Sequence, residues 1–264
     1  MSESTNLREP HAQLVMAHGW LLRGRIWQPL QQQLEPQWSC WAPDLPGFGS
    51  AQRPPGLSPT LPAYGRWLAQ EAKQRAAGGP LVLLGHSLGG SVVLHAAALL
   101  GDQLQGIVLL GCGGGVYQRR PFARLRQVGC ALSWFQGDRR AARGLLLNST
   151  QRRAVAGLPK LVSQLAMPSL WVGGGNDQVM QPVYVRHLAG YAPDHQIEVL
   201  PGAGHLPMRD QPAALARILQ EGHDENVHSI RTHVVRKCNC HCCCRLCPAV
   251  TAGPAWRVTD GSAR

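Results

Sequence analysis

The chain has 264 residues, of which 44% are hydrophobic and 16% are charged, and its formal net charge is +11. This composition provides the apolar side chains of a sizeable core and excludes a wholly disordered chain. The N-terminal residues contain no apolar signal-peptide segment, and no apolar run approaches the roughly 18 residues of a membrane span. We therefore expect a cytoplasmic protein with no stable membrane insertion.

The cysteines divide the chain into two unlike parts. Residues 1–222 contain only three of the nine, which is typical of a reducing compartment, whereas six crowd into residues 238–247. Residues 223–264 show no hydrophobic periodicity, so we expect a poorly ordered tail, either native or the product of a frameshift or read-through. Its cysteines are too closely spaced for the two separated ligand pairs of a structural zinc site. We expect no metal and no cofactor.

Short apolar runs alternate with helical patterns along the chain. The predicted strands are residues 13–17, 38–42, 81–84, 106–110, 169–172 and 196–200. The predicted helices between and after them are residues 24–34, 64–76, 88–100, 183–188 and 213–220. Because these strands lack polar alternation and are separated by helices, they predict an α/β fold with a doubly wound, mostly parallel sheet.

Residues 112–168 interrupt this alternation. They open with a run of glycines and contain helical stretches at 122–135 and 138–147. A buried insertion could not satisfy its backbone hydrogen bonds, so we expect a short helical cap that lies over one edge of the sheet. The core then consists of residues 1–111 and 169–222.

The strongest motif is LVLLGHSLGG at residues 81–90. Its G-x-S-x-G follows a buried strand and opens an apolar helix, which is the setting of a nucleophile elbow. The glycines at 85 and 89 allow the backbones to approach in the sharp turn, and Ser87 is presented outward. A serine hydroxyl becomes a useful nucleophile only when a base takes its proton.

Two later residues complete the expected order of nucleophile, acid and base. Asp177 follows a predicted strand at its carboxyl end, and His205 lies in a tight loop after the last strand. His187 and His195 are the rival bases, but the first lies within a predicted helix and the second in a Pro-Asp turn. We predict that Ser87, Asp177 and His205 are the catalytic residues.

An oxyanion intermediate needs two preorganised hydrogen-bond donors. We expect one to be the backbone N–H of Leu88, at the N-terminus of the helix after Ser87. The other is expected in the loop after the first strand, where the backbone N–H of Trp20 is our choice, and Trp20 is also a candidate substrate contact. His18 in the same loop is expected to shape it rather than to act as a base.

These motifs, together with residues 44–49 (DLPGFG), resemble in order and spacing the α/β-hydrolase superfamily over residues 11–222. The resemblance implies that superfamily's fold and its Ser-Asp-His mechanism. Within it, His18-Gly-Trp20, Trp27 and residues 44–49 are most similar to the carboxylesterases that demethylate pimeloyl-acyl-carrier-protein methyl ester in biotin synthesis. The substrate implied is a small-molecule or carrier-bound ester, cleaved through an acyl-enzyme.

Other functions share the same motif. A general carboxylesterase, a lipase or a thioesterase on small acyl substrates would use the same three residues. A ligand-binding relative with little turnover is a further alternative, which the intact triad does not exclude. The positive net charge suggests nucleic-acid binding as a further function. However, the chain lacks interleaved aromatic residues and any recognisable nucleic-acid-binding module, so we expect no nucleic-acid partner.

The positive charge is concentrated in residues 112–168, which contain ten cationic side chains and one acidic one, a net charge of +9. The rest of residues 1–222 sums to −1. We interpret this excess as a docking surface for an acidic carrier protein, because arginine grips carboxylates and phosphate well. The candidate partner-binding residues are Arg119, Arg120, Arg124 and Arg126. A solvated helical face and a membrane surface are the alternative interpretations.

Overall fold

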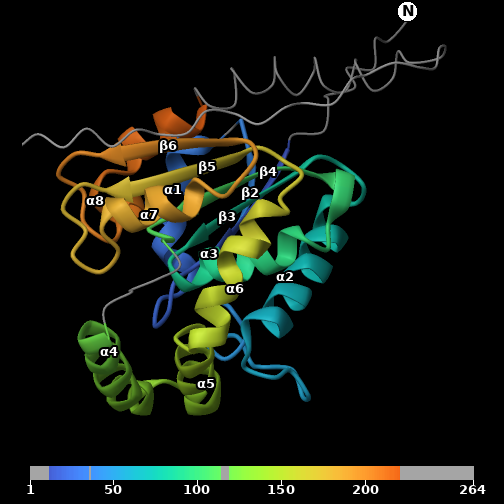
Figure 1. Ribbon diagram of the computed structural model, residues 1–264. Coiled ribbons are helices and arrows are strands. Elements are labelled where there is room, and N and C mark those ends of the chain that lie inside the picture. The colour runs from blue at the N-terminus through green and yellow to red at the C-terminus, as the bar shows by residue number, and fades with distance from the viewer. Residues whose placement is uncertain (1–11, 36, 114–118, 221–264) are drawn as a thin grey trace, which may run out of the picture. The chain divides into compact units, whose positions relative to one another are not determined.

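The computed structural model describes residues 12–35, 37–113 and 119–220, without the side chains of residues 119–122, 124 and 125. The predictions made for the N-terminal segment and for the tail after residue 222 lie outside these residues. The strands form one six-stranded sheet in the order β2-β1-β3-β4-β5-β6 (Figure 1). Their bounds are β1 Gln13–Ala17, β2 Ser39–Trp41, β3 Leu81–His86, β4 Leu104–Leu110, β5 Ser169–Gly174 and β6 His195–Leu200.

All five neighbouring strand pairs of this sheet are parallel, which confirms the predicted fold class. The chain passes from β1 to β2 on one side and then returns to β3 on the other. Ala17 at the end of β1 pairs with Gly85 near the end of β3. A reversal of this kind opens a crevice at the carboxyl ends of the two strands, where α/β proteins bind ligands. The loop after Ala17 and the turn after His86 therefore meet at one place.

Helices cover both faces of the sheet. One face carries α1 Gln28–Leu34, α8 Pro207–Asp210 and a last helix over residues 212–220, and the other carries α2 Leu61–Ala76, α3 Leu88–Ala97 and α7 Pro182–Ala189. Along β1, Leu14 and Met16 belong to one hydrophobic cluster, and Val15 and Ala17 to the other. Successive side chains of a strand point to opposite faces, so a sheet buried on both sides requires a continuous apolar run.

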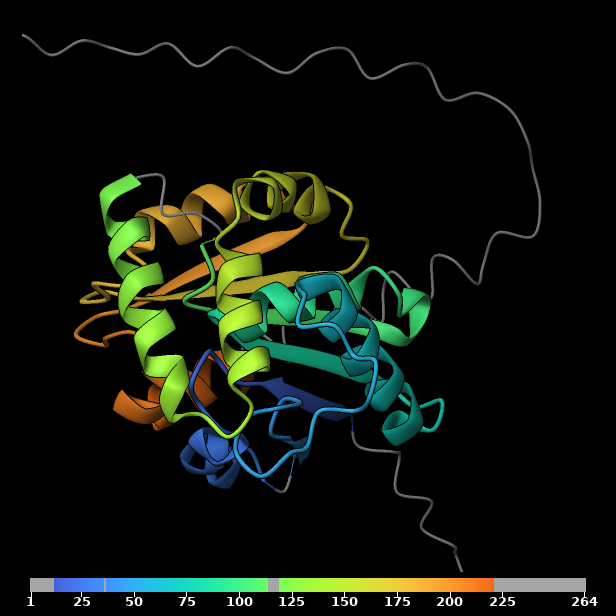
Figure 2. The same cartoon turned by 90° about the horizontal axis from the view of Figure 1, so that it is seen from below.

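Three helices lie between β4 and β5 and are here called the cap helices: α4 Arg119–Leu132, α5 Arg139–Ser149 and α6 Arg152–Ser163. Figure 1 shows α4 and α5 on the side of the sheet away from β6, and Figure 2, seen from below, shows them in front of the sheet. The sequence predicted helices near the first two but missed α6. This helix contains Pro159, which normally ends a helix, and its N-cap residue Gln151 makes no side-chain cap bond. Burial of Leu158 and Val162, one turn apart, stabilises it instead.

The boundary of α2 also differs from the prediction. The helix begins at Leu61 rather than near residue 64, because the Thr60 side chain accepts a hydrogen bond from the backbone N–H of Ala63 and Pro62 occupies the first turn. Both features are typical of a helix start. Along its length α2 packs against α3, and the two helices approach closely at Gly65, since a Cβ on it would lie 2.5 Å from His95 Cβ.

Gly65→Ala should therefore destabilise the protein, although alanine is the better helix former. The added methyl group forces α2 and α3 apart, at a cost of about 1–3 kcal/mol in the free energy of unfolding. Gly157→Ala in α6 is the matched control, because a Cβ there meets nothing within 4 Å. That change should raise the free energy of unfolding by up to about 1 kcal/mol. Urea unfolding of both variants measures whether the free energy of unfolding falls or rises. A Gly65→Ala protein more stable than the wild type would contradict the close approach of α2 and α3.

Candidate active site

Ser87 occupies a sharp turn between β3 and α3. Its backbone has φ 52° and ψ −114°, a conformation that non-glycine residues rarely adopt. The turn closes because Gly85 and Gly89 carry no side chains: a Cβ on Gly85 would lie 2.6 Å from the backbone of Gly90, and one on Gly89 would collide with the carbonyl oxygen of Ala17. The two glycines predicted from the sequence therefore allow the turn that places Ser87 at the N-terminus of α3.

Asp177 and His205 are brought together from the loops after β5 and β6. His205 Nδ1 donates to Asp177 Oδ2 at 2.7 Å, so the imidazole carries its proton on Nδ1 and leaves Nε2 as an acceptor. Asp177 is 2% exposed, and its Oδ1 accepts from the backbone N–H groups of Val179 and Met180, each at 2.8 Å. Burial by itself raises the pKa of Asp177, but these hydrogen bonds, led by that from His205, lower it below its ordinary value.

His86, which the sequence analysis did not single out, supports the loop of His205. Its Nε2 donates to the His205 carbonyl oxygen at 2.7 Å, and the two rings lie 4.7 Å apart. Burial lowers the pKa of His86 to about 3, so this ring stays neutral. The signal that could have found it is its position: the residue before the elbow serine ends β3 and must face the loops at the carboxyl edge of the sheet.

The rival histidines lie elsewhere. His187 is on α7 and forms an edge-to-face contact with Tyr191. His195 is the first residue of β6 rather than part of a Pro-Asp turn, because it pairs with Ser169 of β5 and its Nδ1 donates to the carbonyl oxygen of Ala192 at 2.8 Å. Neither lines the cavity that contains Ser87.

His18 fixes the loop after β1. The ring is fully buried; Nδ1 donates to the carbonyl oxygen of Gly19 and Nε2 accepts from the backbone N–H of Leu45, both at 2.8 Å. Burial lowers the pKa of His18 to about 4, so the ring is neutral and connects the two loops by its hydrogen bonds. This arrangement agrees with the expectation that His18 shapes the loop.

Trp20 connects this loop to the cap helices. Its indole Nε1 donates to the carbonyl oxygen of Ala142 in α5 at 2.8 Å, and its ring lines the same cavity as Ser87. Leu88, at the first position of α3, lines that cavity as well, and the first backbone N–H groups of a helix have no partner within it. The two residues chosen for the oxyanion hole thus both border the Ser87 cavity.

The cavity has a volume of about 410 Å³ and walls from the core and from the cap helices. Its polar side chains, apart from the Trp20 indole N–H, are those of His86, Ser87, Ser91, Ser149, Thr150 and His205. The apolar walls come from Trp20, Leu22, Leu88, Leu146, Val155, Leu158, Val179, Met180 and Leu206. Cys112 also lines it, but burial raises the pKa of this thiol to about 12, so it stays protonated. The site combines a buried carboxylate, a partly exposed imidazole, a partly exposed serine and a largely apolar chamber.

Among the described residues, no group of three or more His, Cys, Asp and Glu side chains could hold a metal ion. Within the same ranges, no helix has the length and apolarity to cross a membrane. Of the four arginines predicted to bind a partner, all lie on α4, and Arg126 is exposed. The side chains of Arg119, Arg120 and Arg124 lie outside the described part of the structure.

The burial of His18 predicts a specific pH dependence of stability. An imidazole in the unfolded chain keeps the ordinary pKa of 6.5, whereas that of folded His18 is about 4. The unfolded state therefore takes up the proton first, and stability present above pH 6.5 is lost as the pH falls toward 4. This residue should account for up to about 3 kcal/mol of that loss.

His18→Gln keeps an acceptor for Leu45 and removes the titration. The variant should be less stable than the wild type at neutral pH, yet its free energy of unfolding should fall less steeply between about pH 6.5 and 4. Urea unfolding at several pH values checks this. Equal slopes for the two proteins would show that His18 does not titrate on unfolding.

Comparison with known proteins shows similarity to one large protein family. The model of the family described as "Alpha/beta hydrolase family" matches residues 14–218. The chain is 29% identical over 246 residues to the pimeloyl-[acyl-carrier protein] methyl ester esterase of Xanthomonas axonopodis pv. citri (strain 306), covering 78% of this chain and 93% of that protein. It is also 29% identical over 248 residues to the protein of the same name from Stenotrophomonas maltophilia (strain K279a), covering 78% and 91%.

Solved structures with the same fold include a thermophilic esterase from Thermogutta terrifontis. It superimposes with a TM-score of 0.67 at 23% identity, over 81% of this chain and 90% of that one. Carboxylesterase CesB from Bacillus subtilis superimposes with a TM-score of 0.60 at 16% identity, over 81% and 84%. At these identities the likeness is one of fold.

Proposed function

The chain belongs to the alpha/beta hydrolase family, and we propose that it is a serine esterase that cleaves carboxylic esters through an acyl-enzyme. The observation that carries the proposal is the hydrogen bond between the buried Asp177 carboxylate and the partly exposed His205 ring, at a cavity that Ser87 also lines. A neutral imidazole whose Nδ1 is held by a carboxylate presents Nε2 as a base, which is what a serine nucleophile needs. The names of the curated relatives, which are methyl ester esterases, support the same reaction.

In the proposed mechanism Ser87 Oγ attacks the ester carbonyl carbon and His205 Nε2 takes its proton. The backbone N–H groups of Leu88 and Trp20 stabilise the oxyanion, and Asp177 stabilises the imidazolium. The imidazolium then protonates the leaving alkoxide, and the alcohol departs. Water, deprotonated by His205, attacks the acyl-enzyme, and the proton returns to Ser87 as the acid leaves.

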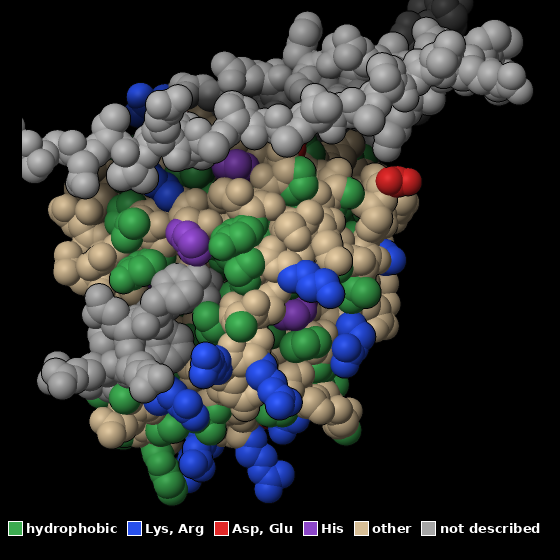
Figure 3. Space-filling view, viewed as in Figure 1, with side chains coloured by type: hydrophobic (Ala, Val, Ile, Leu, Met, Phe, Trp, Pro, Cys, Tyr) green, Lys and Arg blue, Asp and Glu red, His purple; other side chains and the backbone are tan. Residues whose placement is uncertain are grey.

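For the substrate, we propose the methyl ester of an acyl chain carried by an acidic acyl-carrier protein. The apolar walls of the cavity suit an acyl chain, and the curated relatives are named for such a substrate. The cap helices supply the charge that an acidic partner requires. Figure 3 shows Lys and Arg side chains gathered on the face of α5 and α6.

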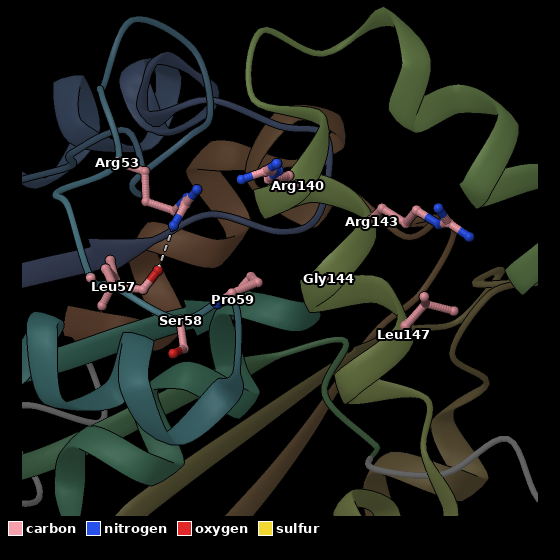
Figure 4. A pocket seen from close by; sticks show the side chains of 9 residues that line it. Arg53, Leu57, Ser58, Pro59, Arg140, Arg143, Gly144 and Leu147 are labelled. Carbon is pink, nitrogen blue, oxygen red and sulfur yellow. Dashed lines mark hydrogen bonds between the residues drawn. The ribbon is translucent and has the colours of Figure 1, made fainter.

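A second hollow on the cap supports this partner. It has a volume of about 550 Å³ and lies between the loop of residues 53–59 and α5, bordered by Arg53, Arg140 and Arg143 (Figure 4). Arg53 is held by Asp138 at 2.7 Å and by the carbonyl oxygen of Leu57 at 2.6 Å. In Figure 4 Arg140 extends toward the loop that carries Arg53, whereas Arg143 extends to the other side of α5. The guanidinium of Arg140, on the side of α5 that faces this loop, is placed to bind a carboxylate or phosphate of a carrier.

Ser87→Ala and His205→Ala should each lower kcat by a factor on the order of 10⁴–10⁶ for a p-nitrophenyl ester, with the circular dichroism spectrum unchanged. Asp177→Asn should lower kcat by a smaller factor, because the carboxylate orients and stabilises the imidazole without reacting. His187→Ala and His195→Ala are matched controls that should keep near-normal turnover. Near-normal kcat in His205→Ala would make the assignment of the base wrong.

Reversing the charge of Arg119, Arg120, Arg124 and Arg126 together should raise KM for a carrier-bound methyl ester about tenfold or more and spare small p-nitrophenyl esters. The reason is that attraction between charged surfaces acts mainly on association and weakens with salt, here tested between 50 and about 500 mM. Arg23→Glu with Arg25→Glu, exposed cations outside the cap helices, is the control. Equal effects on both substrates would favour a general carboxylesterase, lipase or thioesterase without a carrier.

A further inference from the structure

The end of α4 and the turn that follows expose large apolar side chains. Val128 is 58% exposed, Leu132 42%, Trp134 65% and Phe135 84%. Residues 126–143, which contain them and the start of α5, are here called the cap apex. Exposure of this extent at four positions within eight residues is unusual for a surface that meets only water.

Three of the four exposed apolar side chains share one face of this helical segment. Val128, Leu132 and Phe135 follow one another at intervals of four and three residues, which places them on one helical face. Gly129 and Ser133 lie on the opposite side and are buried: a Cβ on Gly129 would meet Leu146 and Trp20, and Ser133 Oγ donates to the carbonyl oxygen of Gly129 at 2.7 Å. The inner side of the helix is therefore already packed, and the apolar side faces outward.

Cationic side chains are frequent in the same segment, and one of them contacts an exposed aromatic ring. Arg126, Arg139, Arg140 and Arg143 are all exposed, and the guanidinium of Arg139 lies 4.7 Å from the centre of the Trp134 ring. Asp138 is the one acidic residue in the sequence of the cap apex, and its carboxylate is occupied by Arg53 and by the first turn of α5. Figure 3 shows hydrophobic and cationic side chains together at this end of the molecule.

We propose that the cap apex binds the surface of an anionic phospholipid bilayer. Trp and Phe partition into the interface between headgroups and acyl chains, and arginines beside them pair with lipid phosphates. A second copy of this chain is a poorer partner, because a two-fold contact would set the arginines of the two copies against each other. The binding is peripheral and goes beyond the esterase function proposed above.

Sedimentation of the full chain with vesicles tests this proposal. The wild type should co-sediment with vesicles of phosphatidylcholine and phosphatidylglycerol, less at high salt, and weakly with phosphatidylcholine alone. Trp134→Ala with Phe135→Ala should weaken binding to the anionic vesicles at least about tenfold, as should Arg139→Glu with Arg140→Glu. Val183→Ala with Tyr191→Ala, exposed apolar residues outside the cap helices, is the matched control and should bind like the wild type.

Ser87→Ala should bind vesicles as the wild type does, so a failure of the esterase assignment does not affect this test. Turnover of a soluble p-nitrophenyl ester and circular dichroism verify that the apex variants remain folded. The proposal is overturned if the wild type does not bind anionic vesicles, or if the apex and control variants bind them equally. It is also overturned if the aromatic variant raises KM for a carrier-bound ester, or abolishes self-association, without a change in vesicle binding.

Discussion

The close approach of backbones around Ser87 is the constraint on which the site depends. A non-glycine residue at φ 52° is strained by about 1–3 kcal/mol and persists only where its surroundings fix it. Here β1, β3 and the first turn of α3 meet at contacts that only Gly85 and Gly89 allow. The sheet order follows from the same requirement, because β1 must lie beside β3 for its following loop to reach the elbow.

Neutral histidines hold the loops around this turn. His18 ties the loop after β1 to Leu45, and His86 ties the elbow to the loop of His205. Burial lowers the pKa of both rings well below the ordinary value, so they act as fixed donors and acceptors. His205 differs because Asp177, itself buried, holds its Nδ1. The three imidazoles of this site thus have different environments and hydrogen-bond partners. Two of them connect loops, and the third is the proposed base.

The cap helices give this scaffold its individual character. They close the cavity with apolar side chains such as Leu146 and Leu158, and Trp20 joins them to the core through the carbonyl oxygen of Ala142. Their outer surface carries the excess positive charge and the exposed aromatic pair Trp134 and Phe135. The surfaces proposed to bind larger partners therefore lie on the insertion, whereas the residues proposed for the chemistry lie at the carboxyl edge of the sheet.

The sequence by itself determined the strands, the parallel sheet and the order of Ser87, Asp177 and His205, because buried strands and glycine-bounded turns leave local patterns. It missed α6, which contains Pro159 and is stabilised by burial of Leu158 and Val162, and it misplaced His195, which pairing with β5 draws into β6. It also missed His86, whose bond to the His205 carbonyl oxygen spans 119 positions. Only the tertiary structure decided these features: the pairing of His195 and the bond of His86 join segments far apart in the sequence, and the burial of α6 depends on the helices that it packs against.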